Sequence, residues 1–100
     1  MEFKEICNQD FEQFREIAAR FQKVLPEDAN ELYDISKKSW ILATRWSEIQ
    51  SMARKIADTY GINKTDFGTW AYQIYRQLQE MHITTRSWYR LAVEELKNAE

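Results

Sequence analysis

Residues 55–70 read Lys55-Ile56-Ala57-Asp58-Thr59-Tyr60-Gly61-Ile62-Asn63-Lys64-Thr65-Asp66-Phe67-Gly68-Thr69-Trp70. This stretch predicts a helix, a glycine turn and a second helix. Gly61 suits the turn because glycine adopts a positive φ without a steric penalty at Cβ. Ala57 lies four residues before it, and Ile62, Phe67 and Trp70 recur at the spacing of one buried helical face. The stretch therefore favours a fold built from packed helices.

The spacing over residues 55–70 resembles the helix-turn-helix of DNA-binding proteins, in which a small residue lets the second helix cross close over the first. A related pattern spans residues 78–91, with Leu78 in place of the small residue and His82 in place of the turn glycine. The resemblance, over residues 55–91, implies a DNA-binding role. A fainter one links Ser-Trp-Tyr-Arg-Leu at 87–91 to the helix-bundle domains of archaeal plasmid primases, which bind template strand and nucleotides.

The composition suits one helical domain over residues 1–100. A hydrophobic content of 44%, with 14% aromatic residues, is sufficient for a packed core and argues against intrinsic disorder. With two glycines and one proline, the chain has few turn signals, so long helices are favoured over a β-sandwich or barrel.

The cysteine content and the hydropathy pattern indicate a soluble, cytoplasmic protein. A single cysteine excludes an intramolecular disulfide and suits a reducing compartment. No apolar run approaches the roughly 20 residues of a membrane span, and the first residues lack signal-peptide character. We therefore expect no membrane association.

The periodicity predicts an all-α fold, a compact bundle of four to five helices. An apolar stripe over residues 3–25 predicts a first helix that ends before Pro26. Asp28 and Glu31 form a capping box that begins a long central helix with an apolar seam over 32–60. This helix is either continuous or kinked, or it breaks at residues 36–39.

The C-terminal part predicts a helix-turn-helix-like region. Asn63 or Thr65 caps a helix that runs to about residue 81, and a turn follows at residues 82–83. Thr84 or Thr85 then caps a last helix over residues 86–98.

The net charge of −2 conceals an uneven distribution. Residues 1–35 have four Lys/Arg against nine Asp/Glu (−5), and residues 36–93 have nine against four (+5). Residues 94–100 add −2, which completes the total. A polyanionic partner would therefore contact the middle and later parts of the chain.

The candidate nucleic-acid-binding residues are hydroxyl, amide and basic side chains near the expected helix starts. Hydroxyls and arginines donate hydrogen bonds to phosphates, arginine also reads guanine, and a helix N-terminus adds partial positive charge. The chosen residues of the later stretch are Thr84, Thr85, Arg86, Ser87, Tyr89 and Arg90. Asn63 and Lys64 begin the earlier helix, which we expect to support the later one.

Exposed aromatic residues interleaved with basic ones offer a second route to nucleic acid. Trp40, Tyr72, Tyr75 and Tyr89 fall outside the best apolar stripes. Such side chains stack on bases, or they form an apolar patch for a protein partner.

The sequence does not favour an enzyme. His82 is the only histidine, and Cys7, the only thiol, lies on the apolar stripe of the first helix. One histidine beside Glu80 falls short of a metal site, and no glycine-rich phosphate loop occurs. We expect no catalytic residue, no metal and no cofactor.

Two functions are therefore weighed. The first is a small nucleic-acid-binding protein, with DNA favoured, that acts as a transcription regulator or a replication accessory. The second is a helical protein–protein interaction module, an adaptor or inhibitor from a virus or plasmid. It is motivated by the seam over residues 32–60, which one small domain would leave partly uncovered. A homodimer is compatible with both.

Overall fold

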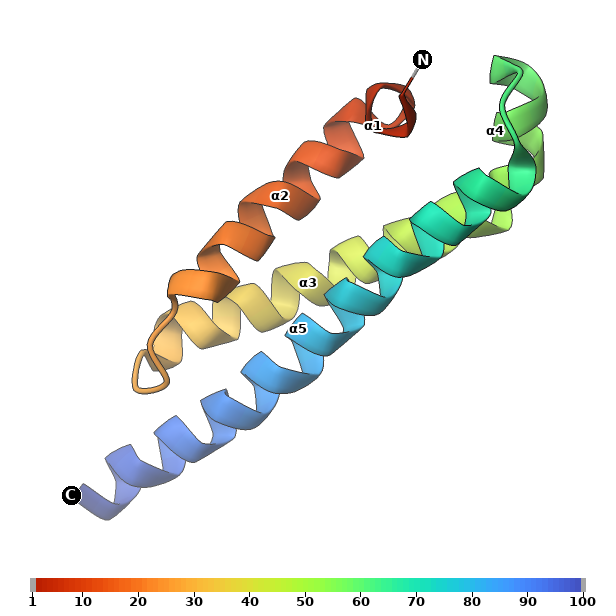
Figure 1. Cartoon of the computed structure of the whole chain (residues 1–100). Coiled ribbons are helices and arrows are strands. Elements are labelled where there is room, and N and C mark those ends of the chain that lie inside the picture. The colour runs from red at the N-terminus through yellow and green to blue at the C-terminus, as the bar shows by residue number, and fades with distance from the viewer. Residues whose placement is uncertain (1, 100) are drawn as a thin grey trace.

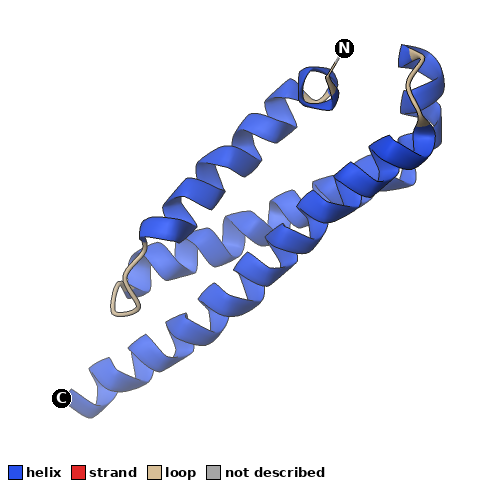
Figure 2. Ribbon diagram, in the orientation of Figure 1, coloured by secondary structure: helices blue, strands red, loops and turns tan. Residues whose placement is uncertain are grey.

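The computed structural model describes residues 2–99, and within them the fold is all-α, as predicted (Figures 1 and 2). Five helices follow in order: α1 (Phe3–Ile6), α2 (Asn8–Lys23), α3 (Ala29–Ser51), α4 (Ala53–Tyr60) and α5 (Lys64–Ala99). The longest helix is α5, with 36 residues, whereas the sequence predicts the longest helix in the middle of the chain.

The long helices α3 and α5 lie side by side and antiparallel, and they form the main packing contact (Figure 1). Helix α2 packs against both of them, while α4 turns back at the far end of α3 and leads into α5. The molecule measures 59 × 19 × 15 Å along its principal axes, so the bundle is elongated.

The core follows the line along which α2, α3 and α5 meet. Trp46 and Ile35 of α3 and Phe67 and Leu78 of α5 are fully buried, and Phe14 and Ile17 of α2 cover them from one side. Burying a side chain of this kind stabilises the fold by about 1.5–3 kcal/mol. The periodic apolar residues of the sequence therefore become the common core.

The predicted helix ends at Asp28, Gly61 and Asn63 are confirmed. The Asp28 side chain accepts a hydrogen bond from the Glu31 amide, at 3.2 Å. Gly61 adopts a left-handed conformation with φ of 66° and ends α4. The Asn63 side chain accepts from the amides of Thr65 and Asp66, so Asn63 rather than Thr65 caps α5.

The predicted turn at residues 82–83 is wrong, because α5 continues through it without a break. Leu78, Met81, Thr85 and Ala92 continue one buried stripe along α5. The hydroxyl of Thr85 donates to the Met81 carbonyl at 2.6 Å and needs no partner outside the helix. Since His82 is compatible with a helix interior, nothing ends the helix here, and residues 78–91 form no helix–turn–helix unit.

The helix predicted over residues 28–60 is interrupted at Met52, and the alternative break at residues 36–39 does not occur. Ser39 is fully buried inside α3 and donates to the Ile35 carbonyl at 2.7 Å, so it does not cap a new helix. The first predicted helix also divides, at Cys7, into α1 and α2. Neither break contains a proline or a glycine, so the sequence has no signal for it.

The seam over residues 32–60 is covered within the chain itself. Leu32, Ile35, Trp46 and Ile49 of this seam are buried in the bundle. Packing against α2 and α5 thus covers this seam without a partner helix. Only Tyr60, at the end of the seam, is exposed.

Candidate functional site

The α3–α5 pair has an open side, which α2 does not cover. The residues of α3 toward α2 include Leu42 and Ile41, whereas Trp40 lies on the opposite flank with side chains of α5. A hollow on this flank is lined by Trp40, His82, Ile83, Arg86, Ser87 and Arg90. With Tyr33, Lys37 and Tyr89 beside it, we call this set of residues the open α3–α5 face.

The centre of the open α3–α5 face is a contact between Trp40 and His82. The two ring centroids are 5.0 Å apart and the ring planes are tilted by 41°. His82 Nδ1 lies 2.9 Å from the carbonyl oxygen of Ser36 and 3.2 Å from its hydroxyl. A ring nitrogen this close to a carbonyl oxygen is in position to donate to it. The contact with α3 therefore orients His82, which lies against Trp40.

A second aromatic pair extends the face toward the start of α3. Tyr33 precedes Trp40 by two helical turns, and its ring centroid is 5.4 Å from that of Tyr89 on α5. Tyr33 and Trp40 are each 55% exposed. Two large aromatic side chains on one flank of one helix are thus available to a ligand.

The cations of this face have no acidic partner. Within residues 2–99, no carboxylate lies within ion-pair distance of Lys37, Arg86 or Arg90. On the flank of α3 toward α2, by contrast, Lys38 pairs with Asp34 at 3.0 Å and Arg45 with Asp10 at 3.1 Å. Unpaired cations are free to bind an anionic ligand without first breaking a pair.

The acidic N-terminal part of the chain supplies the partners on the other flank. Arg20 of α2 donates to Asp34 at 2.7 Å and also pairs with Glu31. The Arg20 guanidinium, through these hydrogen bonds, holds the pKa of Glu31 and that of Asp34 below their ordinary values. Basic side chains are thus paired with carboxylates on the flank of α3 toward α2, and they have no such partners on the open α3–α5 face.

Half of the predicted site residues come together on this face. Arg86, Ser87 and Arg90 are exposed, and Tyr89 is half-buried against Tyr33. Thr85 is fully buried, and Thr84 lines a different hollow, between α5 and α2. Neither threonine starts a helix, so the helix N-terminus expected at this point is absent.

Asn63 and Lys64 lie apart from that cluster. Both are exposed at the start of α5, where Asn63 serves as the cap. Lys64 precedes Arg86 by 22 residues, which corresponds to about 33 Å along a helix. The structure therefore does not join them to the open α3–α5 face.

The sequence did not identify Tyr33, His82 and Ile83 as site residues. His82 was expected at a turn, where its contact with Ser36 of α3 could not be foreseen. Tyr33 and Ile83, which is 62% exposed, have a detectable signal: both are large apolar residues outside the buried stripes. A search for exposed aromatic and aliphatic residues on two facing helices would have found them.

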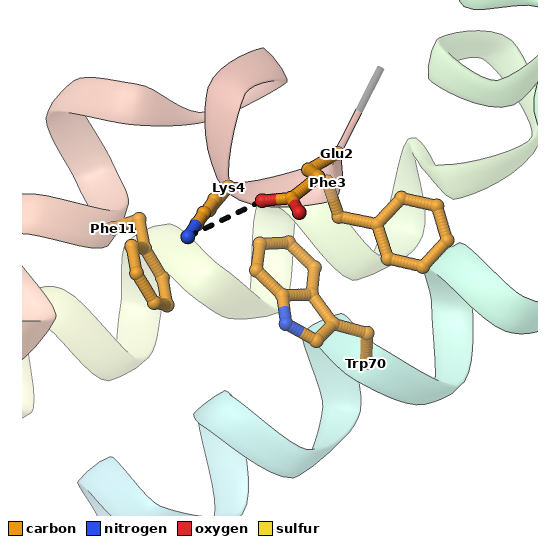
Figure 3. Close-up of a pocket in the computed structure, with 5 residues that line it drawn as sticks. All are labelled: Glu2, Phe3, Lys4, Phe11 and Trp70. Atoms are coloured by element: carbon orange, nitrogen blue, oxygen red, sulfur yellow. Dashed lines mark ion pairs between the residues drawn. The ribbon is translucent and has the colours of Figure 1, made fainter.

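Another hollow lies at the opposite end of the bundle, where α1 crosses the aromatic core (Figure 3). Phe3 and Phe11 face Trp70, with ring centroids at 5.6 Å and 5.8 Å, and the side chain of Lys4 lies above them. Lys4 is paired with Glu2 at 3.2 Å. Since its rings contact one another and its cation is neutralised, this hollow offers a ligand less than the open face does.

The chemistry of the remaining polar groups is limited. Cys7 is buried, and burial raises the pKa of its thiol, which disfavours the reactive thiolate. Across residues 2–99, no three His, Cys, Asp or Glu side chains lie close enough to hold a metal ion. In the same part of the chain, no helix has both the length and the apolar character required to cross a membrane.

Comparison of this chain with protein-family models, with curated proteins and with solved structures finds no match. The candidate function therefore depends on the geometry of the chain itself.

Proposed function

We propose that this protein binds nucleic acid through the open α3–α5 face. The observation that carries the proposal is the exposed Trp40 among three cations, Lys37, Arg86 and Arg90, that have no acidic partner in residues 2–99. Phosphates require cations that are free to approach them, and bases offer flat rings to aromatic side chains. A nucleic acid supplies both groups.

The route differs from the one that the sequence suggested. Arg86 and Arg90 project from the interior of α5 and not from the first turn of a recognition helix. Their spacing of four residues places them one turn apart on the same flank, about 6 Å along the helix. Phosphate binding then depends on basic side chains alone, without a contribution from a helix N-terminus.

The acidic net charge does not oppose this proposal. The carboxylates that pair with Arg20, Lys38 and Arg45 lie where α2 and α3 face each other: Glu31 and Asp34 belong to α3 and Asp10 to α2. Glu31 and Asp34 are already paired with Arg20 and Lys38, so they oppose phosphate less than free carboxylates would. Locally, the open face is positive.

The test is an anisotropy titration of labelled DNA and RNA at two salt concentrations. Three phosphate contacts predict an affinity that falls about 20- to 40-fold between about 50 mM and about 200 mM salt. The double substitution Arg86→Ala and Arg90→Ala should weaken binding and reduce the slope of log affinity against log salt by about two contacts. Undetectable binding at low salt, or binding that does not depend on salt, would contradict the proposal.

A matched control removes the same charge elsewhere. Arg54 and Lys55 both lie exposed on α4 and have no ion pair within residues 2–99, so Arg54→Ala with Lys55→Ala changes the net charge equally. This variant should bind as the unchanged protein does. If both double variants lose affinity to the same extent, the binding is a non-specific response to net charge.

A protein partner is the second candidate function, favoured by the apolar surface near the C-terminal end of α5. Leu91 is 59% exposed there, and it borders a hollow together with Pro26, Glu27, Trp88, Ala92 and Glu95. Exposed apolar groups with acidic neighbours suit a basic, apolar protein surface. If this surface meets the basic open α3–α5 face of a second copy, light scattering will show self-association that Leu91→Glu abolishes.

A further inference from the structure

We infer that the open α3–α5 face takes a single strand and not a duplex, with Trp40 as the platform on which an unpaired base stacks. This inference rests on the proposed function and names the form of nucleic acid that the geometry accepts. It follows from three features: the exposure and support of Trp40, the spacing of the aromatic and basic side chains, and the width of the helix pair.

Trp40 is exposed and also held in place. More than half of its surface is accessible, while His82 lies against it at 5.0 Å between ring centroids. His82 in turn is held by the Ser36 carbonyl at 2.9 Å. An aromatic ring whose orientation is supported by its neighbours loses less conformational freedom when it stacks on a base. The chemistry of stacking is tolerant of sequence, because every base has a flat face.

The aromatic and basic residues follow the two helices over similar lengths. Tyr33 and Trp40 are seven residues apart, which is about 10 Å along α3. On α5, His82 and Arg90 are eight residues apart, or about 12 Å. At about 3.4 Å for each stacked nucleotide, this length corresponds to three or four nucleotides. The face is therefore long enough for a short single-stranded segment.

A duplex fits this face poorly. The major groove of B-DNA is about 12 Å wide and admits one helix, whereas two helices packed at about 8–10 Å between axes are wider than the groove. Neither α3 nor α5 projects from the other here, because they lie side by side (Figure 1). In a duplex, moreover, the base faces are stacked on one another and are not available to Trp40.

The test compares a labelled single strand of about 12 nucleotides with a blunt-ended duplex of equal length and composition, at about 50 mM salt. We expect the single strand to bind at least about tenfold more tightly and to quench tryptophan fluorescence. Trp40→Ala should weaken single-strand binding by about tenfold or more, whereas Trp40→Phe should retain most of the affinity. Circular dichroism and thermal unfolding check that both variants are folded.

A control for the aromatic substitution is Tyr60→Ala. Tyr60 is 47% exposed and ends α4, beyond the end of α3, so its loss should leave binding unchanged. Equal or tighter binding of the duplex would overturn the inference. So would a Trp40→Ala variant with unchanged affinity while the Arg86 and Arg90 double variant is weakened; that outcome keeps nucleic-acid binding and excludes stacking. If neither form of nucleic acid binds, the proposed function fails as well.

Discussion

The two flanks of α3 have different electrostatic surroundings although they belong to the same helix. Toward α2, Lys38 and Arg45 pair with carboxylates, and Arg20 of α2 reaches back to Glu31 and Asp34. On the open α3–α5 face, Lys37 of α3 and Arg86 and Arg90 of α5 have no carboxylate partner within residues 2–99. The comparison separates basic residues that stabilise the fold from basic residues that are available to a ligand.

The largest effect is expected when the open face is given a carboxylate of its own. Ser87 is exposed, lines the hollow with Arg86 and Arg90, and lies three residues before Arg90 on α5. Ser87→Glu should pair with Arg90 and repel phosphates, so nucleic-acid affinity should fall about tenfold or more. Stability should change by no more than about 0.5 kcal/mol, because the position is on the surface.

This prediction is measured by the same anisotropy titration, together with urea unfolding. Ser87→Gln serves as the control, since it keeps the size of the new side chain without its charge. A Ser87→Glu variant that binds as tightly as Ser87→Gln would show that the face does not contact phosphates.

A smaller effect, on stability and not on binding, is expected on the flank of α3 toward α2. Arg20→Met keeps a long apolar stem but removes the guanidinium that joins α2 to Glu31 and Asp34. The three side chains are partly exposed, so the free energy of unfolding should fall only modestly. Nucleic-acid affinity should stay the same. A variant that binds weakly but unfolds normally would mean that the two flanks are not separate in function.

The smallest effect in this comparison concerns pH. Hydrogen bonds from Arg20 lower the pKa of Glu31 and of Asp34 from their ordinary values of 4.5 and 3.8. The unfolded chain therefore binds protons more readily than the folded one as the pH falls through this range. Their stabilising contribution is complete above about pH 5 and is lost progressively in stronger acid.

Urea unfolding at neutral pH and at about pH 3 measures this loss. Arg20→Met should reduce the difference between the two conditions, because Glu31 and Asp34 then titrate nearer to their ordinary pKa values. An identical pH dependence in both proteins would assign the acid sensitivity to other carboxylates.

The structure brings half of the predicted site residues together, for a reason that the fold makes clear. Arg86, Ser87, Tyr89 and Arg90 share one helical region in any case, so an error in the position of the helix start did not separate them. Thr84 and Thr85 were chosen for a helix N-terminus, and they lost that role when α5 proved continuous. The wrong prediction of a turn at residues 82–83 thus affected only Thr84 and Thr85, whose expected role required a helix start.

By itself, the sequence determined the all-α class, the buried stripes and the helix ends at Asp28, Gly61 and Asn63. These features depend on residues close together in the chain: periodic apolar side chains, a capping carboxylate or amide, and a glycine at positive φ. The tertiary structure alone decided that α5 passes through His82 and that the helix is interrupted at Met52, between α3 and α4. It also decided that Arg20 and Arg45 meet carboxylates across α2 and α3, and which basic residues gather around Trp40.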